Sequence, residues 1–311
     1  MGKDRNKQFY IGIFLVLMLI FGAVVLLYYG DIASDAVASV YPAPDAVVTY
    51  TGTVGADCGN RLCRNHVCAW FVTHADTVDT SAAPWWLYSD GTLVVGGGII
   101  QWDASINSAI SPWDCHSYDI FRIIFTDLII AESIGGLFAG LPNLTTIEGL
   151  DLFDTSDVTS MGWMFHGASS LTSLDLSNFD TGNVENMSRM FAGTSSLTSL
   201  DLSGFDTRNV RTMRWMFHEA SSLTSLDLSS FDTGSVVDMG GMFEGASSLT
   251  SLDLSGFDTS NVINYMHFMF AGTSSLRSLD LSNFDTSSVE DMSEMFEGTN
   301  RLRNPEGLIH Q

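Results

Sequence analysis

Lysine is almost absent from this sequence of 311 residues, in which Lys3 and Lys7 are the only two. Lysine and arginine together number 13, against 36 aspartate and glutamate residues, and the formal net charge is -23. A nucleic acid would be repelled by such a chain rather than neutralised by it. The composition therefore excludes nucleic acid as a partner.

Cysteine is missing from the whole second half of the chain, because all four cysteines lie between residues 58 and 115. If the chain is exported, two disulfides are expected, with three pairings open. Zinc binding with His66, His74 or His116 is the alternative, but the four-residue gaps between the first three cysteines differ from the usual Cys-x-x-Cys knuckle. The disulfide candidates are Cys58, Cys63, Cys68 and Cys115.

Signatures of catalysis are also missing. The sequence has no Gly-x-Ser-x-Gly, no His-Glu-x-x-His and no EF-hand spacing. The glycine run at residues 96–98 leads into an apolar stretch rather than into Lys or Ser/Thr, so it predicts a corner between strands instead of a phosphate site. We expect no enzyme, no cofactor and no resident metal; an enzyme would need its site within residues 51–133.

What the sequence does contain is a repeat. Copies begin 26, 26, 26, 27 and 26 residues apart, with one residue inserted near Tyr265. Each copy closes with a Met-Phe pair such as Met190-Phe191. The copies open at Leu171, Leu197, Leu223, Leu249, Leu276 and Leu302.

One repeat predicts a short strand followed by a short helix. Leu171, Leu174 and Leu176 have the Leu-x-x-Leu-x-Leu spacing, which places Asp175 outward. The later apolar residues, from Val184 to Phe191, are three and four apart, as on one face of a helix. The expected helix caps are Asp157, Asn183, Asn209, Ser235, Asn261 and Ser288 at the start, and at the end Gly167, Gly193, Gly245, Gly272 and Gly298, with Glu219 as the exception.

The N-terminus carries an uncharged apolar run at residues 9–29, which as a helix would be roughly 31 Å long and would match a bilayer. Lys3, Arg5 and Lys7 precede it, so we expect the N-terminus inside and the remainder outside the cell membrane. A cleaved signal peptide, with a small-x-small site at residues 36–38, is the competing interpretation.

These segments predict five parts: a cytoplasmic tail at 1–8, a single-pass signal-anchor helix at 9–29, an extracellular linker at 30–50, a β-rich cap region with the cysteines at 51–143, and a solenoid at 144–311. Within the cap region, residues 85–88 and 92–95 flank Asp90-Gly91 as a β-hairpin. Residues 118–125 predict another strand that leads into the solenoid. The fold class expected is α/β, a solenoid of the leucine-rich-repeat type.

The repeat Leu-Thr-Ser-Leu-Asp-Leu-Ser-Gly-Phe-Asp-Thr at residues 197–207, followed by Val-x-x-Met-x-x-Met-Phe, resembles the BspA-like family of bacterial leucine-rich-repeat surface proteins. The stretches at 86–93 and 111–113 resemble the lead-in of that family. The resemblance implies a cell-surface protein used in adhesion, without catalysis. This chain differs from many relatives because its last residues, 307–311, contain no wall-sorting motif. We therefore expect the N-terminal helix to be the anchor.

Two ladders of aspartates recur with the period. One follows the Phe of each copy, as Asp180 does, and is expected to accept amide hydrogen bonds within turns. The other is expected on the exposed strand face, where a solvated face is favoured over a cation site. This possible cation ladder comprises Asp175, Asp201, Asp227, Asp253 and Asp280.

The position two residues after the first inward Met of each copy varies freely while its surroundings hardly change. Exposed Trp beside Arg is typical of binding hot spots, although Trp lying flat over neighbouring repeats is an equal alternative. We therefore expect an extracellular protein or glycan ligand on this surface, with a passive acidic spacer as the other function class. The candidate surface comprises Trp163, Arg189, Trp215 and Phe268.

Overall fold

A computed structural model describes residues 48–53, 83–100, 110–131, 133–263 and 265–303. The chain divides into two compact units, residues 1–41 and 42–311, and all described residues belong to the second. In the described residues no helix is long and apolar enough to cross a bilayer. The predicted signal-anchor helix at 9–29, the cytoplasmic tail and most of the linker lie outside the described residues.

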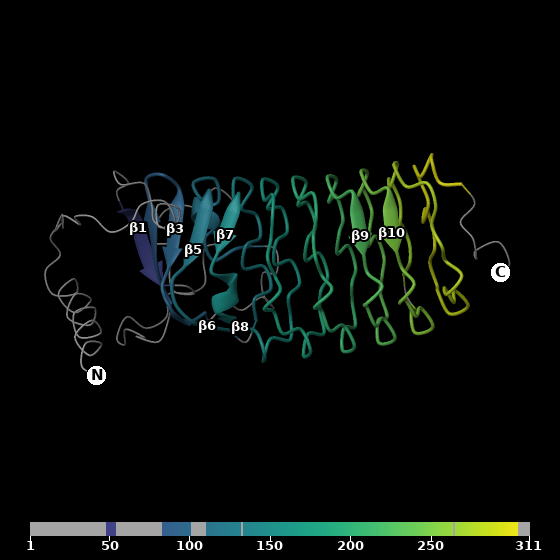
Figure 1. Cartoon of the computed structure of the whole chain (residues 1–311), viewed down its shortest axis with the longest axis horizontal. Helices are drawn as coiled ribbons and strands as arrows, with labels where there is room; N and C mark the ends of the chain where they lie inside the picture. Colours follow the sequence, from purple (N-terminus) through teal and green to yellow (C-terminus); the bar gives the residue numbers. More distant parts are fainter. Residues whose placement is uncertain (1–47, 54–82, 101–109, 132, 264, 304–311) are drawn as a thin grey trace, which may run out of the picture. The chain divides into compact units, whose positions relative to one another are not determined.

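The second unit is a β-solenoid whose coils stack side by side along one axis (Figure 1). It begins with an antiparallel pair, β1 (Val48–Thr53) and β2 (Pro84–Tyr88), followed by β3 (Thr92–Val95), which is antiparallel to β2. The predicted hairpin is confirmed, because the Gly91 amide donates to the Tyr88 carbonyl and Gly91 is left-handed at φ 80°. Asp90 accepts the Thr92 amide at 2.9 Å and so fixes the turn.

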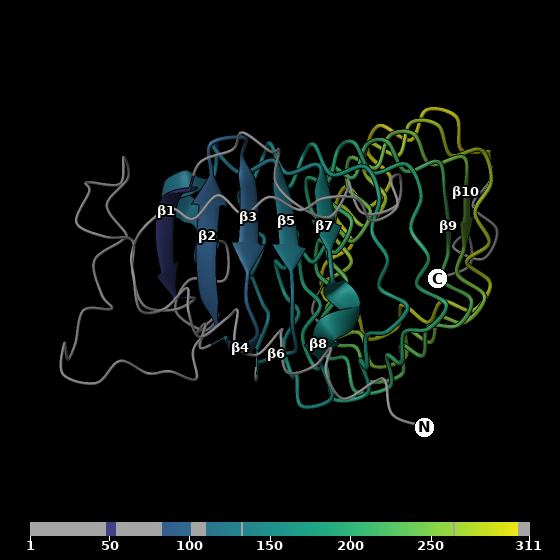
Figure 2. The ribbon, with the colours of Figure 1, turned by 60° about the vertical axis from the view of Figure 1, so that its left-hand side comes forward.

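Parallel stacking starts at β3, inside the predicted cap region. β3, β5 (Arg122–Phe125) and β7 (Thr146–Glu148) form one parallel run, so that the five-stranded sheet has the order β1-β2-β3-β5-β7 (Figure 2). A second parallel sheet has the order β4-β6-β8, from β4 (Gly98–Ile99), β6 (Ile129–Ile130) and β8 (Phe153–Asp154). The glycine run is thus a corner between β3 and β4, as predicted.

Short 3-10 helices are the only helices in the part of the chain described, namely η1 (Asp114–His116) and η2 (Leu150–Leu152). The predicted helix in each repeat is therefore wrong. Further along, the strands β9 (Ser225–Asp227) and β10 (Ser251–Asp253) pair in parallel on the Leu side of the coils, the side that carries Leu174 and its copies.

The segment predicted as helix instead runs along the solenoid wall; we call it the Met-Phe side, residues 186–193 and their copies. Every second backbone amide of this segment donates a hydrogen bond to a carbonyl of the next coil, at 2.7 to 3.1 Å. The pairs, donor first, are Met187 with Thr212, Arg189 with Arg214, Phe191 with Met216, and Gly193 with His218. Between them lie tight turns, such as Met190 N–H to the Met187 carbonyl. Isolated parallel bridges join Ser160, Asn186, Thr212, Asp238, Tyr265 and Asp291 in series.

Consecutive tight turns also space inward side chains three and four apart, which is why the apolar pattern imitated a helix. Three of the six residues predicted as caps at the start of the segment have another role. The side-chain amides of Asn183, Asn209 and Asn261 donate to carbonyls of the preceding coil, those of Ser156, Gly182 and Gly234, at 2.6 to 2.7 Å. The prediction of a left-handed glycine after the segment is confirmed at each of the five glycines. Glu219, the predicted exception, is left-handed as well, with φ 54°.

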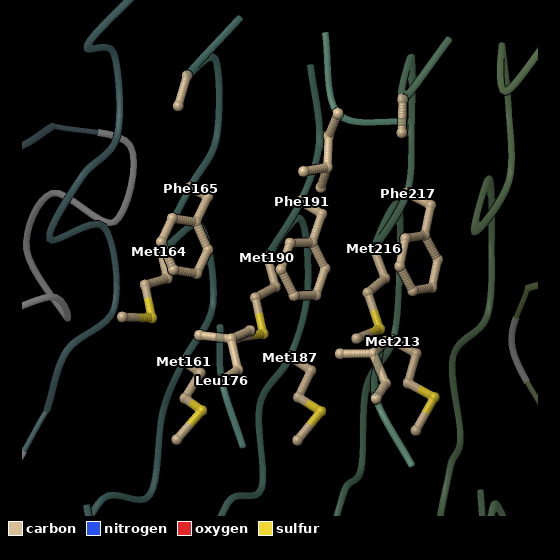
Figure 3. Packing of buried hydrophobic residues seen from close by; sticks show 14 of the residues in the cluster. Met161, Met164, Phe165, Leu176, Met187, Met190, Phe191, Met213, Met216 and Phe217 are labelled. Atoms are coloured by element: carbon tan, nitrogen blue, oxygen red, sulfur yellow. The ribbon is translucent and has the colours of Figure 1, made fainter. Parts of the chain in front are cut away.

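The core between the walls is a set of side-chain ladders (Figure 3). Phe165, Phe191 and Phe217 are fully buried and stack 5.6 to 5.7 Å apart within 7° of parallel. The methionines Met164, Met190 and Met216 line up beside them. Burial of most Leu, Val, Met and Phe positions of the repeat is therefore confirmed. The exceptions are partly buried and pack against the core: Leu174, Leu200 and Leu252 on the Leu side, and Phe284, Val289, Met292, Phe296 and Leu302 at the last coils.

Candidate functional site

The variable positions of the Met-Phe side share an unusual backbone conformation. Trp163, Arg189, Trp215 and Phe268 have φ values of 64°, 56°, 55° and 56°, which is the left-handed region. Glycine occupies the same position at Gly136 and Gly241 and is also left-handed there. For a side chain other than glycine this conformation costs roughly 1–2 kcal/mol. The column therefore carries bulky residues at a position where the backbone favours glycine.

Three of these side chains form a stack across successive coils. The Cζ atom of Arg189 lies 4.4 Å from the centre of the Trp163 ring and 3.9 Å from that of Trp215. All three residues are half-buried rather than exposed. The expectation of exposed tryptophans is thus corrected, because each indole packs on the arginine of the neighbouring coil.

The stack extends on one side beyond Trp215. The Cζ atom of Arg214 lies 3.9 Å from the Trp215 ring and 5.3 Å from the Tyr265 ring, and the Arg214 guanidinium pairs with Asp238 at 3.6 Å. A Cβ atom at Gly241 would clash with the Trp215 ring, so glycine is needed there for space as well as for φ. Phe268 lies beyond that gap and contacts His267, with ring centres 5.4 Å apart.

Histidines border this column. His166 meets Trp163 edge-on at 4.7 Å between ring centres, and burial lowers its pKa, as do the charges of Arg189 and His218. His218 lies 3.6 Å from Glu244 and 4.0 Å from Glu219. Sequence reasoning missed these residues and Arg214. His166 and His218 each follow a tryptophan of the variable column by three residues, whereas Arg214 has no counterpart in the other copies. Among the described residues no cluster of His, Cys, Asp and Glu suits a metal ion.

The possible cation ladder on the Leu side has a structural role in every coil. Each Asp of this ladder is exposed and accepts, through Oδ1, the amide of the serine two residues along at 2.9 to 3.1 Å. For Asp175 the Ser177 hydroxyl, with the Ser177 amide, holds the pKa below its usual value. One oxygen of every carboxylate is therefore already engaged in a turn. A hollow of about 700 Å³ lies over Asp227, Asp253 and Asp280 and is also lined by Arg303.

The second aspartate ladder behaves as predicted, because Asp180, Asp232, Asp258 and Asp285 accept the amides two residues along at 2.9 to 3.1 Å. Beside it runs a buried threonine ladder that sequence reasoning missed. The hydroxyl of Thr181 donates to the Asp206 carbonyl at 3.0 Å and accepts the Asp206 amide at 2.8 Å, joining two coils. The Asp-Thr pair that recurs in each copy is the signal that could have revealed it.

Of the cysteines, Cys115 lies in η1 and is not a free thiol. Cys58, Cys63 and Cys68 lie outside the described residues, so the disulfide pairing stays a prediction.

Comparison with known proteins identifies one family. No curated protein and no solved structure matches the chain significantly. The family model described as "Mycoplasma protein of unknown function, DUF285" matches residues 132–248 and 223–308, which cover the repeat array. Together the two matches span more than half of the sequence. The chain therefore belongs to the DUF285 family.

Proposed function

We propose that this protein is a non-catalytic recognition module of the bacterial cell surface, of the BspA-like type, which binds an extracellular protein or glycan through Trp163, Arg189, Trp215 and Phe268. One observation carries the proposal. The column that holds these residues is left-handed, and Gly136 and Gly241 occupy it without strain. Bulky residues in a strained conformation are expected where function requires the side chain.

A neighbouring column gives the comparison. Four residues further along each copy, the left-handed position is glycine at Gly167, Gly193, Gly245, Gly272 and Gly298, and only Glu219 differs. The backbone demand is the same in both columns, yet only one has kept large aromatic and cationic side chains. This contrast supports a role for those side chains beyond closing the coil.

The test is a screen of the purified full chain against extracellular-matrix proteins and a glycan array, with and without calcium. The Trp163→Ala/Trp215→Ala double variant should lose the binding that the parent chain shows, while its melting curve establishes that it folds. Binding that disappears only with a chelator would instead place the site on the ladder of Asp175. Absence of binding to any ligand would favour the passive acidic spacer.

We further propose that the apolar run at 9–29 anchors the protein in the cell membrane with the repeats outside. The motivation is the run itself, preceded by Lys3, Arg5 and Lys7. Protease added to intact cells should then remove the repeats and leave a small membrane-bound fragment. Repeats that resist cleavage until the cells are lysed would overturn this orientation.

A further inference from the structure

The guanidinium of Arg189 lies between two aromatic rings. Its Cζ atom lies 4.4 Å from the centre of the Trp163 ring and 3.9 Å from that of Trp215, and the three residues come from three successive coils. The coils themselves are joined by main-chain hydrogen bonds at this place, such as Arg189 N–H to the Arg214 carbonyl at 2.9 Å. An arginine fixed on both faces loses little further freedom when its N–H groups bind a ligand.

The N–H groups of this guanidinium have no protein partner among the described residues. Its basic neighbours in the next coil all have one: Arg208 pairs with Asp206, Arg211 with Glu185 at 3.6 Å, and Arg214 with Asp238 at 3.6 Å. Arg189 is half-buried, so its charge is partly removed from water; the charge of Glu244 acts on it, but among the described residues no carboxylate lies within ion-pair distance. A stacked guanidinium with free N–H groups suits an oxyanion that accepts two parallel hydrogen bonds.

The surroundings of Trp215 favour a carboxylate over a sugar ring at that indole. A pyranose ring would need a free indole face, but Trp215 already carries the guanidinium groups of Arg189 and Arg214, each with Cζ 3.9 Å from the ring centre. The edge of Trp215 also covers Gly241. A carboxylate on a flexible chain needs only the N–H groups, and these are what the stack leaves available.

Arginines gather near Arg189, although six carboxylates lie in the same two coils. The chain carries a net charge of -23, yet Arg189, Arg208, Arg211 and Arg214 fall in two adjacent coils. We propose that Arg189, held between Trp163 and Trp215, anchors a carboxylate of an acidic polypeptide segment. This inference rests on the proposed recognition function and names its ligand class.

The test uses the full chain and a short fluorescent oligoglutamate peptide, with oligoglutamine as the neutral probe, followed by fluorescence anisotropy. The parent chain should bind oligoglutamate and not oligoglutamine. Arg189→Lys keeps the charge but loses the planar fork, and should weaken binding about tenfold or more. The matched control Arg208→Lys changes a neighbouring arginine that pairs with its own Asp206, and should leave affinity unchanged.

Three outcomes would overturn the inference: no binding of oligoglutamate, equal affinity in Arg189→Lys and the parent, or tighter Arg189-dependent binding of a sulfated oligosaccharide. Both lysine variants should still unfold cooperatively, because neither change removes a main-chain hydrogen bond between coils. Arg208→Lys should melt like the parent, and Arg189→Lys should melt slightly lower because it loses the contact with the two indoles. If oligoglutamate fails while the ligand screen finds binding that the double tryptophan variant loses, the carboxylate anchor falls and the recognition function stands. If that screen also fails with the folded protein, the recognition function falls as well.

Discussion

On the Met-Phe side, two positions in each coil have a left-handed backbone, and this conformation limits which residues fit there. At one of the two columns glycine is nearly uniform, and at the other it alternates with Trp, Arg, Phe and Glu. The sequence alone could not reveal the second column as left-handed, because tryptophan, arginine and phenylalanine do not favour that region. The glycines of the first column, by contrast, were informative, since a positive φ is what glycine supplies most readily.

Glu219 is the exception in the glycine column, and its replacement gives a direct prediction. Glu219→Gly should raise the free energy of unfolding by about 0.5–1 kcal/mol, because glycine adopts φ 54° without the Cβ penalty. Urea unfolding measures the change. The reverse control, Gly245→Ala, places a Cβ atom 3.2 Å from Cγ of Glu219 at φ 73° and should destabilise. A loss of stability in Glu219→Gly would mean that the Glu219 side chain contributes more than the strain costs.

The threonine ladder makes a second prediction. Thr181→Val preserves the shape of the side chain but removes the hydroxyl that serves both the amide and the carbonyl of Asp206. Two main-chain groups then lack their partner, and we expect a loss of about 2 kcal/mol in unfolding free energy. Thr181→Ser keeps the hydroxyl and should lose clearly less. Equal effects of the two variants would assign the stabilisation to packing of the methyl group.

At the scale of structural elements, the sequence predicts those parts of the fold that depend only on the pattern of inward side chains. The period, the buried Leu, Met and Phe positions and the Asp90-Gly91 hairpin follow from spacing and turn chemistry. The Met-Phe side was not predictable, because a spacing of three and four is shared by a helix and by consecutive turns. What distinguishes them is the direction of amides such as that of Arg189, which point at another coil. Such hydrogen bonds lie outside the local sequence.

The first phenylalanine of each repeat, which precedes the Asp-Thr pair, tests this packing. Phe205 is 5 % exposed, and Phe205→Ala should cost roughly 3–5 kcal/mol, as for other buried phenylalanines. The neighbouring coils should lose protection against hydrogen exchange as well, since stability in a solenoid depends on nearest-neighbour contacts. Phe121→Ala, at a residue that is 46 % exposed, is the control and should change little. An unaltered melting curve for Phe205→Ala would contradict the packing described.

For the whole molecule, we expect the stability of the folded state to decrease at acidic pH. The Ser203 amide and hydroxyl hold the pKa of Asp201 below its ordinary value of 3.8, and other turn aspartates such as Asp227 and Asp280 show the same direction. Their contribution is complete above the unfolded value and is lost as the pH falls through the lower folded value. The melting temperature should therefore hold down to about pH 4 and fall below it.

Calorimetry between about pH 7 and about pH 2 would follow this dependence. Asp201→Asn with Asp227→Asn retains an acceptor oxygen for each turn but removes the titrating group, so the fall below about pH 4 should be shallower. A loss of stability that begins well above pH 4 would point to groups other than these carboxylates.

The near-identity of successive coils also bears on how this surface can change over generations. Residues 197–222 form one full period, and their removal would join Ser196 to Leu223, which restores the Ser-Leu junction already present at Ser222-Leu223. Recombination between copies of the repeat can thus delete or duplicate a coil as a cassette without altering the register of the core. Such an event here would remove Arg214 and Trp215 together and bring Arg189 opposite Gly241. Gain or loss of whole coils can accordingly change the surface residues of the Met-Phe side while the solenoid fold stays the same.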